Sequence, residues 1–268
     1  MWLDTHAHLT AEPFDADRDA VIERAQQAGV ETIVAIGAGY GIDHNRKALE
    51  LAARDPRVFA TVGVHPHDAK QLDDAGREGL RAWLGHPRVV AVGECGLDYH
   101  YTYSPRASQR AVFAEQVAWA RETGLPVSIH VRDDGPEAYE EVLDILRGEG
   151  RGDVQGVLHC YTGTLEFAER AIQAGLWISF SGILTFKKDR GLREVARRLP
   201  LSRLLVETDC PLLAPEGYRG RRNEPARVAL VGAALAAAQG CDVEAVARAT
   251  THNARSLFRL PAPGSDAS

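Results

Sequence analysis

Residues 1–8 read MWLDTHAH, an apolar start that runs directly into two histidines, His6 and His8. In an extended strand alternate side chains share a face, so these two imidazoles can point at the same place. Neutral imidazoles that converge at a strand end are good ligands for a divalent metal ion. A His-x-His pair alone is a weak motif, because chance matches are common. The rest of the chain therefore decides whether this pair binds a metal.

The opening pattern of a short apolar run, a loop and an amphipathic helical stretch repeats along the 268 residues. The predicted strands are 2–4, 30–37, 57–67, 88–100, 125–133, 154–163, 176–182 and 202–211. The predicted helices are 17–28, 43–54, 74–84, 105–122, 136–147, 165–174, 189–198, 225–238, 243–249 and 252–258. Near-continuous apolar strands that alternate with helices indicate a parallel sheet buried on both faces. We predict an α/β fold, a (β/α)8 TIM barrel, with an open doubly wound sheet as the alternative. The chain lacks a Gly-rich phosphate loop after the first strand, which disfavours a Rossmann site.

Composition sets the limits on size and partners. A barrel takes roughly 250 residues, so we expect one catalytic domain over 1–260 and a flexible Pro, Ala, Gly and Ser tail over 261–268. The net charge of -6 excludes a global basic field for nucleic acid, so an anionic substrate needs metals or a local basic patch. No apolar stripe marks an oligomer interface, which favours a monomer.

The chain also carries no sign of export. The first residues lack a basic segment followed by an apolar one, and no apolar run approaches the ~20 residues that span a bilayer. The four cysteines are scattered without a C-x-x-C pair, as expected for reduced thiols. We therefore expect a cytoplasmic protein without a membrane partner.

Polar side chains gather at the carboxyl ends of the predicted strands, where barrel enzymes build their sites. These residues are His6, His8, His65, His67, Glu94, Asp98, His130, Arg132, His159, Glu207 and Asp209. Each has a plain structural explanation by itself, such as a cap, a core histidine or an ion pair. Such separate explanations do not account for four imidazoles and two carboxylates at the ends of five strands. Together they suffice for two metal ions, which either Glu94 or Asp209 can bridge.

The motifs resemble one family over nearly the whole chain. They are DTHAHL (4–9), GVHPHDA (63–69), GECGLDYH (93–100), SIHVRD (128–133), HCYTG (159–163), ETDCPLLAP (207–215), RGRRNEP (219–225) and TTHNARSLF (250–258). The chain is similar to the TatD family of metal-dependent hydrolases, deoxyribonucleases within the amidohydrolase-like barrels. Two positions depart mildly from the family pattern: Cys210 replaces Ser or Ala, and Tyr161 replaces Phe.

The resemblance implies a site and an activity. The implied ligands of two metal ions are His6, His8, Glu94, His130, His159 and Asp209, with Glu94 bridging. The implied activity is metal-dependent DNA hydrolysis, often as a 3′→5′ exonuclease on single strands. We expect metal-activated water as the nucleophile, with Asp209 taking its proton and Glu94 as the other catalytic residue. Histidine-rich ligation suits zinc, manganese or iron, and phosphoryl transfer often uses magnesium, so the identity of the ion stays open.

Four further residues are expected to orient ligands or contact substrate. Glu207 either orients a ligand histidine or is a buried ion-pair partner, and Asp98 fixes the following loop or a histidine tautomer. His65 either donates to a phosphate oxygen or makes a loop hydrogen bond. Arg132 faces the mouth and holds phosphate.

Three local clusters are candidates for contacts with DNA. They are the basic runs Arg219, Arg221, Arg222 and Lys187, Lys188, Arg190, and the tyrosines Tyr99, Tyr101 and Tyr103. The basic runs either bind a phosphate backbone or are solvated surface. The tyrosines either stack a base or pack within their loop.

Two other classes of function share this pattern. One is a metal-dependent ester or amide hydrolase, including one that acts on aminoacyl-tRNA-type esters; the other is a metal-loaded scaffold that binds without catalysis. Many barrel hydrolases of the first class bridge their metals with a carbamylated lysine. Glu94 stands at that position here, which favours the nuclease.

Overall fold

The computed structural model describes residues 1–188 and 191–261, within which eight strands form one parallel sheet in chain order. They are β1 (Trp2–Ala7), β2 (Val30–Ala35), β3 (Val58–Val62), β4 (Val89–Asp98), β5 (Val127–Arg132), β6 (Gly156–Leu158), β7 (Leu176–Phe180) and β8 (Leu204–Val206). Ala7 pairs with Cys210, and the His8 N–H donates to the Cys210 carbonyl over 2.8 Å. The sheet therefore closes at its carboxyl end, and the predicted (β/α)8 barrel is confirmed.

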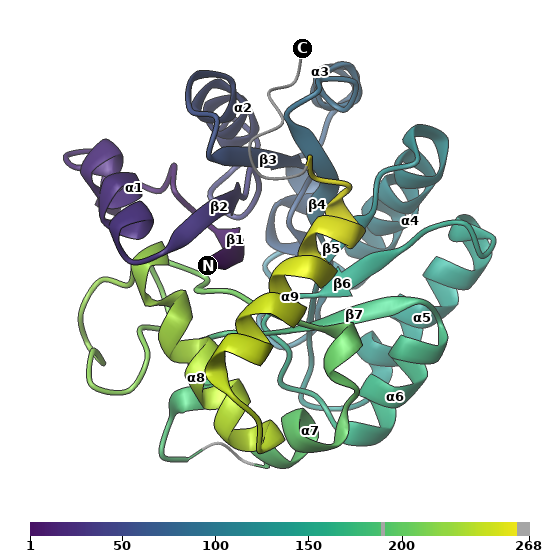
Figure 1. Cartoon of the computed structure of the whole chain (residues 1–268). Helices are drawn as coiled ribbons and strands as arrows, with labels where there is room; N and C mark the ends of the chain where they lie inside the picture. The colour runs from purple at the N-terminus through teal and green to yellow at the C-terminus, as the bar shows by residue number, and fades with distance from the viewer. Residues whose placement is uncertain (189–190, 262–268) are drawn as a thin grey trace.

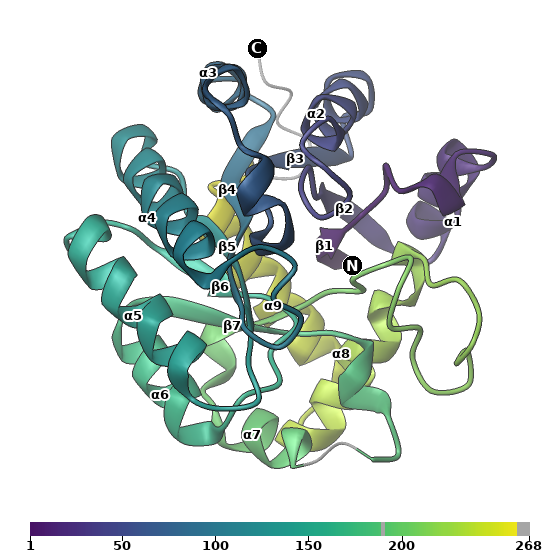
Figure 2. The ribbon, with the colours of Figure 1, turned by 180° about the vertical axis from the view of Figure 1, so that it is seen from behind.

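Helices surround the strands (Figures 1 and 2). They are α1 (Arg18–Gln27), α2 (His44–Arg54), α3 (Asp74–Trp83), α4 (Arg106–Thr123), α5 (Glu137–Gly150), α6 (Leu165–Gln173), α7 (Leu192–Arg198), α8 (Val228–Gln239) and α9 (Val243–Phe258). Short 3-10 turns are η1 (Glu12–Phe14), η2 (Pro66–Gln71), η3 (Gly182–Thr185), η4 (Leu201–Arg203) and η5 (Pro225–Arg227).

Local chemistry sets several helix ends. The Asp73 side chain accepts the Gly76 N–H at the start of α3, and Thr164 caps α6 in the same way through the Phe167 N–H. Helix α4 ends at Gly124, whose φ of +72° lies in the left-handed region that glycine adopts at little cost. These residues fix where α3 and α6 begin and where α4 ends.

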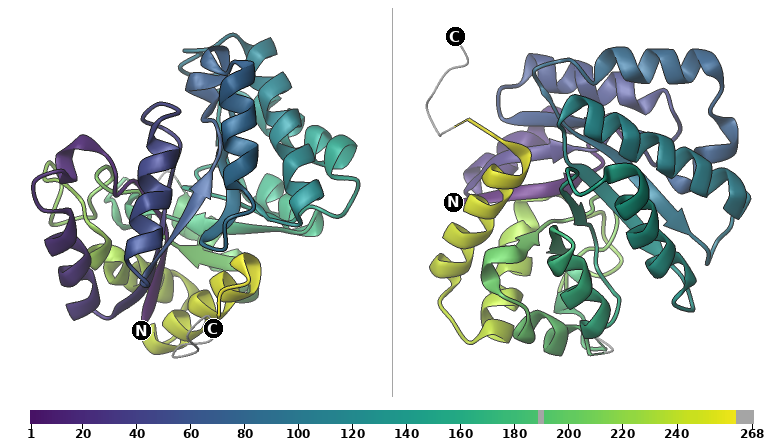
Figure 3. Two further views of the ribbon diagram at one scale, coloured as in Figure 1. Left: turned by 90° about the horizontal axis from the view of Figure 1, so that it is seen from above. Right: turned by 90° about the vertical axis from the view of Figure 1, so that its right-hand side faces the viewer.

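Helix α9 covers the amino end of the barrel, opposite the carboxyl end, where the polar residues lie (Figures 1 and 3). Its Leu257 and Phe258 join a cluster of buried side chains from the first halves of the strands, including Leu3, Phe59 and Trp177. The prediction of two helices, 243–249 and 252–258, is wrong. The helix continues through the β-branched Thr250, whose hydroxyl bonds the Val246 carbonyl, because its apolar stripe packs on the strands.

Several strands are shorter than predicted, and the difference builds the mouth of the barrel. The predicted strands 57–67, 154–163 and 202–211 end at Val62, Leu158 and Val206. Cys160 and Asp209 then take φ values of +44° and +54°, outside the extended region. In the last two of these segments the chain thereby turns its polar residues inward. The predicted helix 189–198 begins at Leu192; residues 189–190 and most of the predicted tail, 262–268, lie outside the described residues.

Length and hydropathy determine whether a helix can span a membrane. No single helix of the described chain is long and apolar enough to cross a bilayer. The bent pair Pro225–Gln239 and Val243–Phe258 passes the length and composition test together, at an angle of 111°, but buried core helices also pass that test.

Asp4 joins the first strand to the segment after the last one. Its buried carboxyl accepts the Thr208 N–H over 2.9 Å and the His6 N–H over 3.3 Å. Burial raises the pKa of Asp4 to about 8, against the lowering effect of these hydrogen bonds. The folded protein therefore holds this carboxyl protonated at neutral pH, where the unfolded chain ionises it.

This pKa predicts a pH dependence of stability. Between pH 4 and the folded pKa of about 8, the folded state binds the extra proton, so Asp4 makes folding less favourable as pH rises. Asp4→Asn removes the titration and keeps the acceptor oxygen. The free energy of unfolding of the variant, relative to that of wild type, should increase by roughly 1.4 kcal/mol for each unit that the pH rises in this range. Urea unfolding of chelator-treated protein at pH 5 and pH 7.5 measures it. A relative stability that is equal at both values would contradict the raised pKa.

Candidate metal centre

The carboxylate of Glu94, in β4, lies at the centre of the polar residues at the carboxyl end of the barrel. Its two oxygens face different groups of side chains. Oε2 faces His6 and His8, from β1 and the residue after it. Oε1 faces His130 from β5 and His159 from the segment after β6. Residues remote in sequence thus meet around one carboxylate.

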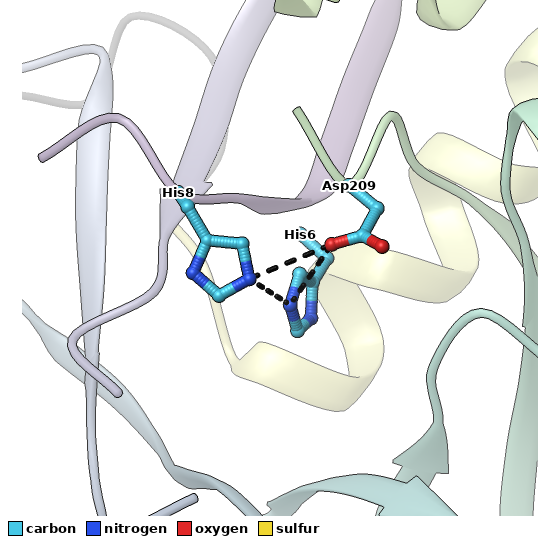
Figure 4. Close-up of side chains that lie close together, drawn as sticks. All are labelled: His6, His8 and Asp209. Carbon is cyan, nitrogen blue, oxygen red and sulfur yellow. Dashed lines mark hydrogen bonds and ion pairs between the residues drawn. The ribbon is translucent and has the colours of Figure 1, made fainter. Parts of the chain in front are cut away.

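The first group contains His6, His8 and Asp209 (Figure 4). The two imidazole Nε2 atoms lie 3.3 Å apart, and Asp209 Oδ1 lies 3.8 Å from His6 Nε2 and 3.5 Å from His8 Nε2. Glu94 Oε2 completes the group at 3.4 Å from His6 Nε2 and 3.6 Å from His8 Nε2. Two atoms that each lie roughly 2.1 Å from one ion are roughly 3 to 3.5 Å apart. The group therefore has the size of a metal coordination shell.

The second group shares the same carboxylate. Glu94 Oε1 lies 2.8 Å from His159 Nε2 and 3.2 Å from His130 Nδ1, and these two nitrogens are 3.4 Å apart. The two groups lie on either side of one carboxylate, and the His6 and His159 rings stack at 3.8 Å. A carboxylate with one oxygen in each group has the arrangement of a bridging ligand.

Unsatisfied polar atoms show that these residues fit a cation better than they fit one another. Glu94 Oε2 is buried and has no hydrogen-bond partner among the described residues. Burial alone would raise the pKa of Glu94, but its electrostatic interactions with the His159, His65 and His6 imidazoles hold this pKa well below its usual range. A buried, ionised carboxylate surrounded by imidazole nitrogens is a strong site for a divalent ion.

Two carboxylates behind the centre orient its histidines. Asp98 Oδ2 accepts from His130 Nε2 over 3.0 Å, which leaves His130 Nδ1 free to face Glu94. Glu207 Oε1 does the same for His159 Nδ1 over 3.2 Å, and also accepts the Cys160 N–H over 2.7 Å. Burial works against ionisation of Asp98, but the hydrogen bonds from His130 and His67 keep the pKa of Asp98 low. Such outer contacts fix the tautomer of a ligand histidine.

His65 has a different role from the other histidines. Its Nδ1 accepts the His67 N–H over 3.1 Å, so in the neutral ring the proton sits on Nε2. That Nε2–H points at Glu94 Oε1 from 3.4 Å. Burial lowers the pKa of His65 to about 4, so the ring is neutral at physiological pH. His65 therefore presents an N–H donor at the edge of the second group, whereas a metal ligand would present a nitrogen without a proton.

The loop after β2 closes one side of the centre. Gly39 has a φ of +96°, and a Cβ there would lie 2.9 Å from His8 Cε1, so this position requires glycine. Tyr40 follows it, with its ring 5.2 Å from that of His8. Burial, followed by the charges of Asp209, Cys210 and Glu94, raises the pKa of Tyr40 to about 12. Its hydroxyl is therefore a donor at neutral pH.

Sequence reasoning gave no role to Tyr40 or His67. The structure places His67 Nε2 2.9 Å from Asp98 Oδ2, beside the contact that Asp98 makes with His130. A usable signal existed for both residues, since each follows the carboxyl end of a strand. An aromatic or imidazole ring in a loop has many explanations, however, and only the fold shows which rings reach the centre.

Of the basic residues outside the centre, some are exposed and others make contacts within the fold. Arg132 is exposed, with its guanidinium 4.6 Å from the Tyr101 ring centre. Arg222 is used within the fold, because it pairs with Asp17 over 2.7 Å. Arg219 lies over the Phe186 ring at 3.7 Å, whereas Lys187 is largely exposed. Arg190 lies outside the described residues.

A closed parallel barrel with imidazoles and carboxylates clustered at its strand ends defines the class of metal-dependent barrel hydrolases. The model of the TatD related DNase family matches residues 3–259. The chain belongs to this family, as its motifs predicted, and is an enzyme, a metal-dependent hydrolase.

Relatives and solved structures agree with this membership. The chain is 41% identical over 260 residues to YabD of Bacillus subtilis, a metal-dependent hydrolase, covering 97% of this chain and all of that protein. It is 38% identical to the 3′-5′ ssDNA/RNA exonuclease TatD of Musicola paradisiaca, with 97% and 99% covered. The structure of YJJV, a TatD homologue from Escherichia coli, matches with a TM-score of 0.89 at 31% identity, with 97% and 98% covered.

Proposed function

We propose that this enzyme is a metal-dependent deoxyribonuclease that removes nucleotides from the 3′ end of single-stranded DNA. The observation that carries the proposal is the Glu94 carboxylate, whose two oxygens face two separate groups of ligand atoms 2.8–3.6 Å away. Paired cations that share a carboxylate are typical of phosphodiester hydrolysis. Relatives named 3′-5′ ssDNA/RNA exonuclease at 35–38% identity support the substrate and the polarity.

In this proposal two divalent ions, Zn, Mn or Mg, bind per chain. His6, His8 and Asp209 would hold the first, His130 and His159 would hold the second, and the Glu94 carboxylate would be shared by both. When bound, such ions lower the pKa of a water molecule and stabilise charge on the phosphoryl oxygens.

The remaining chemistry belongs to the side chains. Asp209 Oδ1 is directed at His6 and His8, and Figure 4 shows its second oxygen turned away from both rings, free to accept the proton of the attacking water. His65 Nε2–H, which faces Glu94 Oε1 in the absence of substrate, would donate to a phosphate oxygen of bound DNA, and the exposed Arg132 would pair with the phosphate backbone. Asp98 and Glu207 hold the imidazoles of His130 and His159 in place.

A chelation experiment tests the proposal. Purified protein treated with EDTA should release no nucleotides from a 5′-labelled single strand, and Mg²⁺, Mn²⁺ or Zn²⁺ should restore stepwise shortening from the 3′ end. Retention of the strand without shortening would indicate a binding scaffold instead. Turnover of carboxylic or aminoacyl esters alone would indicate the ester hydrolase. Either result contradicts the nuclease.

We further propose that residues 1–260 act as one catalytic domain, and that the enzyme is a cytoplasmic monomer. The support is the match of the family model over 3–259 and the free state of all four cysteines. Light scattering coupled to gel filtration tests the monomer: a mass near 29.1 kDa is expected, and a mass near twice that value contradicts it.

A further inference from the structure

Two aromatic rings stand exposed in the loop after β4, close to the centre. Tyr101 and Tyr103 stack on each other with ring centres 5.5 Å apart and planes within 2°. Their exposed fractions are 43% and 59%. The third tyrosine of this loop, Tyr99, is buried at 5% and bonds Glu141, so it belongs to the packing of the loop. A stacked pair that only packed its loop would be covered in the same way.

The pair is fixed to the metal centre through His67 and Asp98. The His67 ring meets Tyr103 and Tyr101 edge to face, at 4.7 and 5.8 Å between ring centres. His67 Nε2 bonds the same Asp98 oxygen that holds His130, and the other Asp98 oxygen accepts the Tyr101 N–H over 2.9 Å. One carboxylate therefore holds both a candidate ligand and the aromatic pair. The rings keep a set distance from the reaction centre.

Charge beside the rings matches a nucleotide. The Arg132 guanidinium lies 4.6 Å from the centre of the Tyr101 ring, on the strand that carries His130. An exposed aromatic face next to a cation suits a flat base joined to a phosphate. A simple carboxylic ester or amide supplies neither of these partners, although an aminoacyl-tRNA-type ester supplies both through its terminal nucleotide.

Given the proposed nuclease function, we propose that Tyr101 and Tyr103 form a stacking platform for the base next to the scissile phosphate, with Arg132 on the adjoining phosphate. The outer ring, Tyr103, supplies the free face, and Tyr101 backs it. Every base has a face that can stack, so the platform holds single strands without regard to sequence. A base within a duplex is already stacked on its neighbours, which makes this surface selective for unpaired ends.

Tyr103→Ala tests the platform in two measurements. With chelator-treated protein, a strand carrying 2-aminopurine next to its terminal bond should lose fluorescence on binding to wild type and not to the variant. With metal restored, the KM for a single strand should rise roughly ten- to a hundredfold, with kcat nearly unchanged. Tyr103→Phe keeps the ring and should behave as wild type. Leu230→Ala removes another exposed apolar side chain, from α8 (41% exposed), and serves as the control for surface truncation.

A substrate with an abasic site at that nucleotide separates stacking from a structural effect. Wild type and Tyr103→Ala should cleave it with the same KM, because no base is present to stack. An equal loss on abasic and normal strands, or an unchanged KM on both, would overturn the platform. Absence of cleavage by wild type on every strand would instead overturn the nuclease proposal, so the two failures are distinguishable.

Discussion

Glu94→Gln is expected to lower strand cleavage on the order of a thousandfold or more and to reduce bound metal from the proposed two ions per chain to at most one. The substitution keeps the shape of the side chain and removes the charge that both groups of ligands share. The amide also offers N–H donors to the bare nitrogens of His130 and His159, and so occupies lone pairs that would otherwise bind an ion. Neither group can then bind its cation strongly, because each depends on one Glu94 oxygen.

Metal content and melting measure this effect independently of activity. Plasma emission after dialysis should show the loss of metal, and the rise in Tm that metal gives to wild type should vanish in the variant. Glu115→Gln makes the same chemical change on α4, at a half-buried carboxylate paired with Arg77, and should leave both measurements unchanged. Two bound ions and wild-type rates in Glu94→Gln would remove Glu94 from the centre.

The fold and the candidate ligands could be predicted from the sequence for the same physical reason. Strand ends of a parallel barrel converge at one rim, so His6, Glu94 and His159 are placed together once their strands are recognised. No loop geometry is needed for that inference. It holds even where the predicted strands run several residues too far, since the polar residues still follow the strand.

The contacts of Asp98 and Glu207 with ligand histidines are among the expected roles, but the tautomer of His65 and the contact of His67 could not be predicted, because they depend on how loops fold. His65 takes its tautomer from the His67 backbone, and His67 reaches Asp98 only because η2 turns the chain back over the barrel. The continuity of helix α9 through residues 250 and 251 was missed for a related reason. Its continuity comes from packing on strands remote in sequence, against the weak helix preference of Thr250 and Thr251.

Asp209→Asn is expected to lower kcat by roughly 10²- to 10⁴-fold while the fold and most of the metal binding persist. The Asn carbonyl can replace Oδ1 beside His6 and His8, but an amide has no basic oxygen left to accept the proton of water. In wild type, burial would raise the pKa of Asp209, but the hydrogen bond to His8 and the charges of His6 and His159 lower this pKa. The carboxylate is therefore ionised at neutral pH.

The backbone conformation at Asp209 determines which substitution tests the carboxylate alone. Asp209 has a φ of +54°, a left-handed conformation that asparagine also tolerates, whereas alanine would add strain to the loss of the carboxylate. Equal melting temperatures and metal content in Asp209→Asn, together with the loss of kcat, separate proton transfer from ligation. A variant that loses its metal in proportion to its activity would make Asp209 a ligand only. Full activity with metal bound would exclude it from the chemistry, and the proton of the attacking water would then need another acceptor at the mouth of the barrel.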